Sequence, residues 1–142
     1  MILHTILVLS RIIFYILSYD LWFYISHRIL HYKFLFNTIH YIHHEQHYSE
    51  MTYKSTYVAH FLENIFQSLG TFIPIAFIQF DPYEFLIVIL FTNIRGMLRH
   101  DFNSIWLIGD HHILHHKYLY CNYGDYYLDY LFNTHYKKNM FK

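Results

Sequence analysis

The chain has 142 residues, of which 55% are hydrophobic, 23% are aromatic and only 14% are charged. Its formal net charge is zero, which argues against a nucleic acid as partner, and its single cysteine, Cys121, excludes an internal disulfide and a cysteine-based metal cluster. A soluble domain of this length needs more charge to cover its surface, so the composition favours a single-domain membrane protein over residues 1–142 rather than a small soluble helical domain.

Residues 1–36 are compatible with an almost continuous helix. Within them, the apolar run at residues 2–19 predicts a membrane helix, although Arg11 stands in its middle. A charged side chain at that position has to lie at an interface, snorkel toward water or face other parts of the protein.

Two further apolar runs, residues 65–80 and 85–94, flank Asp81-Pro82, a dipeptide that favours a turn. Each run is shorter than the roughly 20 residues that a membrane-spanning helix needs. Together they predict a helical hairpin that dips into or through the bilayer, with its tip at Asp81-Pro82. The predicted fold class is therefore all-α, an integral-membrane hairpin with a helical cap that carries the histidines.

A hairpin returns the chain to the side of the membrane that it left. Histidines before residue 61 and after residue 99 are then expected on one face, together with most Lys and Arg residues. Because basic residues favour the cytosolic side, we expect this histidine-bearing cap to face the cytosol.

The first histidine run lies at residues 20–31. Asp20, Tyr24, His27 and His31 follow one another at steps of four, three and four residues, which places them on one face of a helix. His27 and His31 can therefore reach a common metal ion. Asp20 and Tyr24 lie further back, where a carboxylate or phenol could fix the tautomer of an imidazole.

Two other runs repeat one spacing. His40, His43 and His44 form an HxxHH box, and so do the last three histidines of the segment at residues 110–116, which predicts one helical face for each box. His100 adds a ninth candidate. The nine candidate metal ligands are His27, His31, His40, His43, His44, His100, His112, His115 and His116. His111, His60 and His47 are additional candidates that could equally lie outside a metal site.

Neutral imidazole is a good ligand for iron, zinc, copper and nickel. Nine imidazoles exceed what one ion can hold, whereas two ions with four or five ligands each fit the number and leave a coordination position open. A single HxxxH pair is weak evidence, but three runs on one side of a membrane hairpin predict a metal site.

These motifs resemble the fatty acid hydroxylase / sterol desaturase superfamily of integral-membrane di-iron enzymes. Its D-x-x-x-Y-x-x-H-R-x-x-H motif is complete at residues 20–31, its HxxHH box lies at residues 40–44 and its HHxxHH box at residues 111–116. Residues 122–124 match its N-Y-G element, and the resemblance extends from about residue 12 to residue 134. Departures occur at Phe61, where the family often has proline, and at Leu128 and Asn133, where it has tryptophan and glycine.

The resemblance implies a dioxygen-using oxidoreductase that hydroxylates or desaturates a lipid at a di-iron centre held by the nine histidines. It implies two electrons from an external donor, a small haem-type carrier or its reductase, since the chain contains no flavin or nicotinamide motif. It also implies a multi-pass protein of the endoplasmic reticulum or an equivalent membrane. The candidates for partners that orient the ligands are Asp20, Tyr24, Glu63, Asp110 and Asp129.

Three alternatives stay open at this point: a metal-binding or metal-transporting membrane protein without oxygen chemistry, a haem-binding helical membrane protein, and an inactive homologue. The substrate is equally open among sterol, fatty acyl, sphingolipid and ether lipid.

Overall fold

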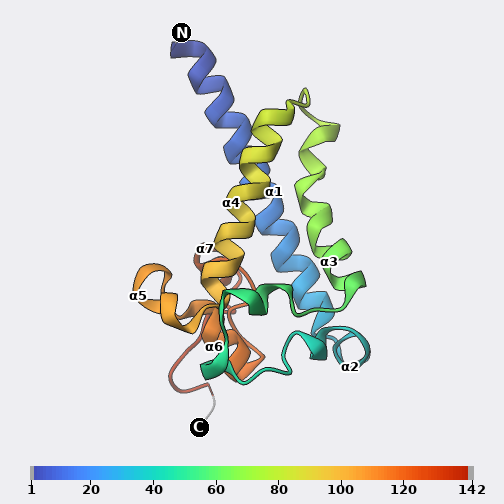
Figure 1. Ribbon diagram of the computed structural model, residues 1–142, viewed down its shortest axis with the longest axis vertical. Coiled ribbons are helices and arrows are strands. Elements are labelled where there is room, and N and C mark those ends of the chain that lie inside the picture. Colours follow the sequence, from blue (N-terminus) through green and yellow to red (C-terminus); the bar gives the residue numbers. More distant parts are fainter. Residues whose placement is uncertain (1, 141–142) are drawn as a thin grey trace.

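The computed structural model describes residues 2–140, and this part of the chain contains helices and no strand, which confirms the all-α prediction. Figure 1 shows long helical segments side by side, with the short helices gathered around one end of them; we call this end of the molecule the cap. The α-helices are α1 (Ile2–Leu30), α2 (Lys33–Thr38), α3 (Phe61–Ser68), α4 (Pro82–His100), α5 (Ile105–Ile108), α6 (His111–Tyr118) and α7 (Tyr126–Leu131). The 3₁₀ turns are η1 (His40–Ile42), η2 (Tyr48–Glu50), η3 (Tyr53–Tyr57), η4 (Leu69–Thr71), η5 (Ile73–Ala76) and η6 (Phe102–Ser104).

Helix α1 is one uninterrupted helix of 29 residues, and among the described residues it is the one helix long and apolar enough to span a membrane. Arg11, in the middle of its apolar run, faces protein: its Nη2 donates to Glu84 Oε1 of α4 at 2.5 Å. An ion pair inside an apolar bundle compensates much of the cost of removing both charges from water.

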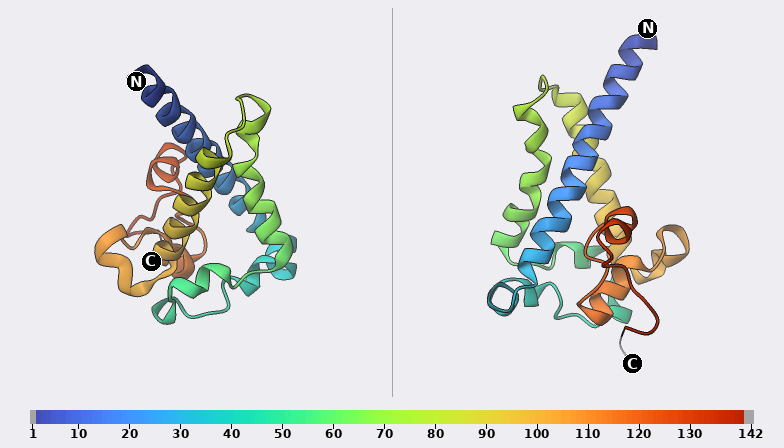
Figure 2. Two further views of the ribbon diagram at one scale, coloured as in Figure 1. Left: turned by 45° about the horizontal axis from the view of Figure 1, so that its top comes forward. Right: turned by 180° about the vertical axis from the view of Figure 1, so that it is seen from behind.

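The predicted hairpin is present as a backbone feature, with α3 leading away from the cap and α4 returning to it (Figures 1 and 2). The carboxylate of Asp81 caps α4 by accepting from the backbone N–H groups of Tyr83 and Glu84, at 2.9 and 3.1 Å. Pro82 then occupies the first turn of α4, where its missing N–H costs nothing.

The first arm of the hairpin is not the continuous helix that its apolar run suggests. Helix α3 ends at Ser68, and the 3₁₀ turns η4 and η5 continue the arm to Ala76. Gly70 allows the arm to approach α1 closely, because a Cβ there would lie 2.7 Å from Cβ of Trp22. Pro74 lacks an N–H group and cannot donate to an α-helical ladder, which favours the short turns.

An ion-pair network joins α1 and α4 to the segment before α7. Arg95 of α4 pairs with Asp20 of α1 and with Asp125, whose oxygen lies 3.2 Å from Arg95 Nη1. Arg99, one turn further along α4, pairs with the same Asp125. These contacts fix the lower ends of the long helices against the cap.

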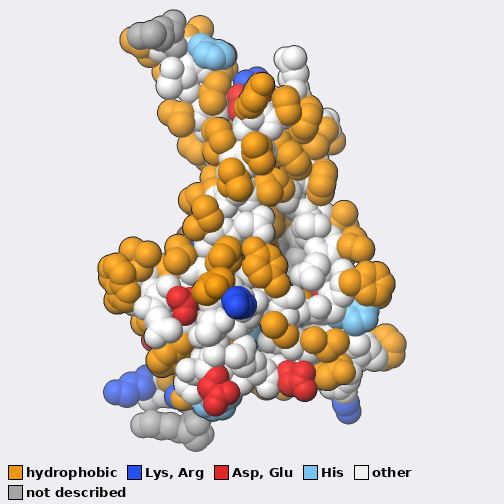
Figure 3. Space-filling view, in the orientation of Figure 1, with side chains coloured by type: hydrophobic (Ala, Val, Ile, Leu, Met, Phe, Trp, Pro, Cys, Tyr) orange, Lys and Arg blue, Asp and Glu red, His pale blue; other side chains and the backbone are white. Residues whose placement is uncertain are grey.

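The surface changes character along the long axis of the molecule. Apolar side chains cover the long helices on the face shown in Figure 3, whereas most charged side chains lie around the cap. Exposed apolar side chains include Ile6, Leu7 and Ile13 of α1, and Leu86 and Leu90 of α4. This distribution is typical of helices that contact lipid at one end of a protein and water at the other.

Candidate metal centre

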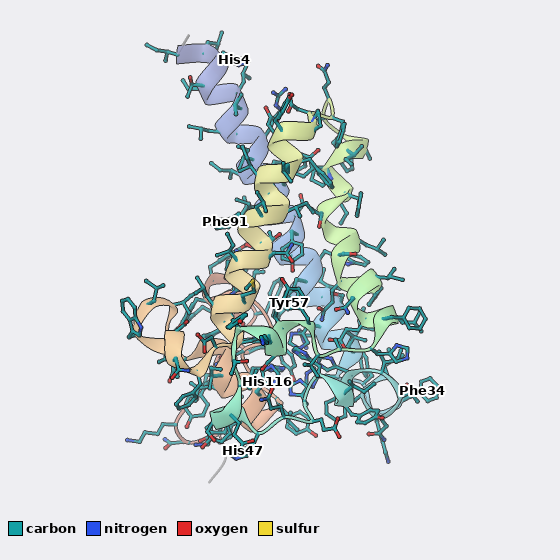
Figure 4. All side chains as sticks on the ribbon, in the orientation of Figure 1. His4, Phe34, His47, Tyr57, Phe91 and His116 are labelled. Atoms are coloured by element: carbon teal, nitrogen blue, oxygen red, sulfur yellow. The ribbon has the colours of Figure 1, made fainter. Side chains whose placement is uncertain are left out.

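Nine histidines come together where α1 and α4 meet the cap. They form two groups, and within each group one ring nitrogen from every histidine lies within 4.8 Å of those of the other members. The first group contains His27, His31, His40, His44 and His115, and the second contains His43, His100, His112 and His116. In Figure 4, His116 lies at this end of the molecule, whereas His4 lies at the opposite end of α1.

Each histidine box serves both groups. In the box at residues 40–44, His40 and His44 join the first group and His43 joins the second. The box at residues 112–116 is divided in the reverse sense, since His112 and His116 join the second group and His115 joins the first. The expectation of one α-helical face for the first box is wrong, because residues 40–42 form a 3₁₀ turn and not an α-helix.

Backbone carbonyls fix the orientation of ligands in the first group. His27 Nδ1 lies 2.6 Å from the carbonyl oxygen of Tyr123, and His115 Nδ1 lies 2.7 Å from that of Cys121. A carbonyl oxygen only accepts, so the proton of each neutral ring sits on Nδ1 and Nε2 keeps its lone pair. This tautomer is the one that binds a metal through Nε2.

Two members of the second group are oriented in the same way. His43 Nδ1 donates to the carbonyl of Val58 at 3.0 Å, and His100 Nδ1 donates to that of Gly96 at 2.7 Å. Their Nε2 atoms then face each other at 3.0 Å with a lone pair on each. Two neutral acceptors at this distance repel each other unless a cation lies between them or near both.

A carboxylate takes the place of the carbonyl for His40. Its Nδ1 lies 2.9 Å from Glu63 Oε1, and both side chains are buried. His40 Nε2 lies 3.1 Å from His27 Nε2 and 3.0 Å from His44 Nε2. A carboxylate–histidine pair of this kind makes the imidazole a stronger metal ligand.

Burial keeps these rings neutral. Desolvation lowers the pKa of His31 to about 3 and that of His43 to about 4. It also lowers the pKa of His44, His115 and His116 well below its usual value, and neighbouring imidazoles add to this effect. Neutral rings with free lone pairs are what metal binding requires.

The described part of the chain leaves several ring nitrogens without a partner. Nδ1 of His44 and of His112 and both nitrogens of His116 are buried and make no hydrogen bond within residues 2–140. Nitrogens that bind one ion at about 2.1 Å are themselves about 3.0–3.4 Å apart, the range in which the facing Nε2 atoms of this site lie. The donor set, its tautomers and its unpaired nitrogens therefore fit two metal ions.

The N-Y-G segment is held in place by Asp129 of α7. The carboxylate of Asp129 accepts from the backbone N–H of Tyr123 and of Gly124, both at 2.9 Å, and from Thr134 Oγ1 at 2.6 Å. It also lies 3.0 Å from His111 Nε2. Asp129 acts on the site indirectly, because Tyr123 is the residue whose carbonyl orients His27.

The three additional histidines lie outside both groups. His111 bonds Asp129, His60 accepts from the N–H of Leu62 at the start of α3, and His47 is exposed and bonds Ser49. Each has a structural partner of its own.

Three of the candidate orienting residues bond no imidazole within residues 2–140. Asp20 bonds Arg95 and Tyr127, and Tyr24 bonds Thr134 and Arg28. Asp110 is exposed before α6. Glu63 bonds His40 directly, whereas the imidazole that Asp129 bonds is that of His111, which lies outside both groups.

The orienting groups that sequence patterns could not identify are the carbonyls of Val58, Gly96, Cys121 and Tyr123. A main-chain carbonyl is present at every residue, so no residue type marks it. The N-Y-G motif was the one sequence signal near these positions.

A cavity of about 290 Å³ opens beside the second group. Its walls come from α1, α3, α4 and the segment around η3, and His43, His100 and His112 lie on it. This size is at the lower end of the range for small-molecule sites.

Comparison with known proteins places these features in a family. The family model described as fatty acid hydroxylase matches residues 12–134. A methylsterol monooxygenase of Aspergillus fumigatus is 32% identical over 147 residues, covering 92% of this chain and 49% of that protein. A very-long-chain aldehyde decarbonylase of Oryza sativa subsp. japonica is 29% identical over 146 residues, covering 92% of this chain and 54% of that protein.

A methylsterol monooxygenase of Arabidopsis thaliana is 29% identical over 140 residues, covering 88% of this chain and 52% of that protein. The chain thus spans about half the length of the curated relatives it matches. No solved structure matches the chain significantly. The family match covers all nine histidines of the two groups, and it confirms the resemblance found in the motifs: the chain belongs to the fatty acid hydroxylase family.

Proposed function

We propose that this chain is an iron-dependent, dioxygen-using oxidoreductase that hydroxylates or desaturates a lipid. The observation that carries the proposal is the convergence of nine histidines into two adjacent groups with facing ring nitrogens. The family match and the oxidative enzymes among the relatives support the class of reaction.

The first group of histidines would hold one iron ion and the second group the other. When bound, iron would supply the redox chemistry that a strong, non-acidic C–H bond requires, which acid–base side chains and zinc cannot provide. The chain itself fixes the tautomers through Tyr123, Cys121, Val58 and Gly96, and it excludes water by burying the rings.

The lipid would reach the histidines through the cavity between α1, α3 and α4. His43, His100 and His112 lie on its wall, and apolar side chains cover the outer faces of the hairpin arms. A lipid could thus enter from the bilayer without crossing water.

The chain would be an integral, multi-pass protein of the endoplasmic reticulum or an equivalent membrane, with its histidines on the cytosolic side. The apolar helix α1 and the basic residues of the cap support this arrangement. Electrons would come from a separate haem-type carrier or reductase, since the sequence has no motif for a flavin or nicotinamide.

The test combines metal analysis with lipid profiling of membranes that contain or lack the full chain, in air and under nitrogen. We expect about two iron ions per chain and a lipid product that forms only in air. Iron or another metal bound without any oxygen-dependent lipid change would contradict the proposal and favour the metal-binding or metal-transporting alternative.

A further inference from the structure

Helix α1 enters the cap at its C-terminal end (Figure 2), and a line of exposed side chains there changes from apolar to polar. The apolar part of this line consists of Leu17, Leu21 and Ile25. Arg28 and Tyr32, which are also exposed, follow at steps of three and four residues. A helix that passes from the hydrocarbon of a bilayer into its headgroup layer typically shows this order. If α1 spans the bilayer as proposed, Arg28 lies at the level of the lipid phosphates on the cap side.

The residues at this level surround a pocket of about 420 Å³, which we call the Arg28 pocket. Besides Arg28, its walls carry four tyrosines: Tyr24, Tyr32, Tyr120 and Tyr123. No carboxylate within residues 2–140 lines it. His31 lies on its wall, so the pocket opens beside the first histidine group, and it shares no lining residue with the cavity beside the second group.

Arg28 has no ion pair within residues 2–140. Its Nη1 donates to the hydroxyl of Tyr24 at 3.2 Å, and its guanidinium carbon lies 5.6 and 5.8 Å from the ring centres of Tyr24 and Tyr123. These neutral contacts hold the guanidinium against aromatic rings and leave its other N–H groups for an anion. Each of the other three arginines of the chain pairs with a carboxylate: Arg11, Arg95 and Arg99.

The groups of the Arg28 pocket match a phosphate. A guanidinium can donate two parallel N–H groups to two phosphate oxygens, and tyrosine hydroxyls can add further donors. In water an exposed arginine needs no fixed partner, but in the headgroup layer it meets the phosphate of a phospholipid. The exposed Leu21 and Ile25 next to the pocket offer an apolar surface to the acyl chains of the same lipid. A free phosphate ion would gain nothing from them, so a lipid suits the site better.

We infer that the Arg28 pocket binds the phosphate of a membrane phospholipid, with Arg28 as the cation and the acyl chains along Leu21 and Ile25. The bound headgroup covers the wall that carries His31 and limits the access of water to the first histidine group. The inference gives a role to the arginine of the D-x-x-x-Y-x-x-H-R-x-x-H motif, which the metal centre does not use. It rests on the membrane placement within the proposed function and does not depend on the oxidation chemistry.

The test measures lipid binding without turnover. The full chain, freed of lipid in a phosphate-free detergent, is incubated with radiolabelled dioleoylphosphatidylcholine. Unlabelled dioleoylphosphatidylcholine, dioleoylphosphatidic acid, dioleoylglycerol and inorganic phosphate serve as competitors. We expect both phospholipids to bind at least about fivefold more tightly than dioleoylglycerol, which has the same acyl chains and no phosphate. Inorganic phosphate in the millimolar range should not displace the lipid.

Variants locate the effect. Arg28→Gln should reduce the preference for phospholipid over dioleoylglycerol by about fivefold. Arg28→Lys should lose less, because an ammonium keeps the charge but cannot donate two parallel N–H groups. The matched control is Lys54→Gln, which removes an exposed cation of η3 outside the pocket and should leave the preference unchanged.

Three results would overturn the inference: displacement by dioleoylglycerol as strong as by the phospholipids, displacement by inorganic phosphate as strong as by the phospholipids, or an equal loss in Lys54→Gln. The first two need no variant, so a variant that misfolds does not rescue the idea.

The membrane placement is tested separately by extraction with alkaline carbonate. Release of the chain would refute the placement and the lipid site together, whereas a retained chain without phosphate preference would refute the Arg28 pocket alone. Phospholipid preference without any oxygen-dependent lipid product would refute the oxidation chemistry alone.

Discussion

His27 can offer only Nε2 to a metal, because its Nδ1 proton is committed to the carbonyl of Tyr123. The same logic applies to His43, His100 and His115, whose Nδ1 atoms face carbonyls. At the scale of single residues, the site is a set of lone pairs directed toward one another. Such a set is unfavourable when empty, so metal binding and folding should be coupled.

Substitution of one histidine in each group tests the two metal positions separately. We expect His115→Ala to remove the iron of the first group and His43→Ala that of the second, because each leaves its group one ligand short. The measurement is iron per chain together with lipid turnover, and both should fall in each variant. His4→Ala, an exposed histidine at the far end of α1, should change neither. Full iron content in both ligand variants would contradict the assignment.

Glu63 provides a test of ligand orientation. Glu63→Ala leaves His40 Nδ1 without its acceptor, so we expect iron affinity to fall about 10- to 100-fold. Glu63→Gln retains an oxygen that can accept from Nδ1 and should lose less. Competition with a chelator measures the affinity, and the exposed Glu50→Ala serves as control. Equal affinity in Glu63→Ala and the unaltered chain would show that the contact is unimportant for the metal.

At the scale of elements, the histidines are carried by short pieces that could not be stable alone. Helix α6 has eight residues, four of them histidine, and an isolated helix of that length does not persist in water. Contacts from the following segment hold it: Asn122 donates to the carbonyl of His111, and Asp129 lies against the ring of the same residue. Helix α7 and the segment before it therefore stabilise the position of α6, which carries the histidines.

Removal of the Asp129 carboxylate should weaken the contacts that hold α6 and the N-Y-G segment in place. Asp129→Ala leaves the N–H groups of Tyr123 and Gly124 without their acceptor, and we expect a loss of unfolding free energy of about 3 kcal/mol or more. Iron content should fall as well, because Tyr123 would no longer hold His27 in place. Thermal unfolding in detergent and metal analysis check both effects. Reduced stability with unchanged iron content would show that the contacts of Asp129 do not affect metal binding.

At the scale of the whole molecule, α1 and the hairpin are held together at both ends. Near the tip, Arg11 of α1 pairs with Glu84 of α4, and near the cap, Arg95 pairs with Asp20. The two pairs keep α1 and α4 in register, which brings His27 and His100 to the same level. Candidate ligands on α1 and α4, more than seventy residues apart in the sequence, thereby come to the same end of the molecule.

The ion pair between Arg11 and Glu84 predicts that substitutions of these two residues have non-additive effects on thermal stability. Arg11→Leu leaves Glu84 buried without its partner and should lower the melting temperature, and Glu84→Leu should do the same to a smaller extent because Arg11 can reach water. The double variant Arg11→Leu/Glu84→Leu should be more stable than Arg11→Leu alone, since no buried charge remains. Additive losses in a thermal unfolding cycle would exclude this coupling.

The amino-acid sequence by itself determined the helical class, the hairpin turn at Asp81-Pro82 and the family, because composition, turn residues and histidine spacing are local properties. It also singled out the nine histidines that the structure brings together, although their role as ligands stays a prediction. It did not determine how closely the first hairpin arm would approach α1, since that depends on the fit of Gly70 against Trp22.

Only the tertiary structure decided how the nine histidines are divided and what orients them. His40 and His43 belong to different groups although they are three residues apart, whereas His27 and His115 share a group across more than eighty residues. The orienting carbonyls, such as that of Tyr123 opposite His27, have no side-chain signature. The physical reason is that spacing along a chain fixes which face a side chain points from, while the direction of a ring nitrogen is set by partners that only folding brings near.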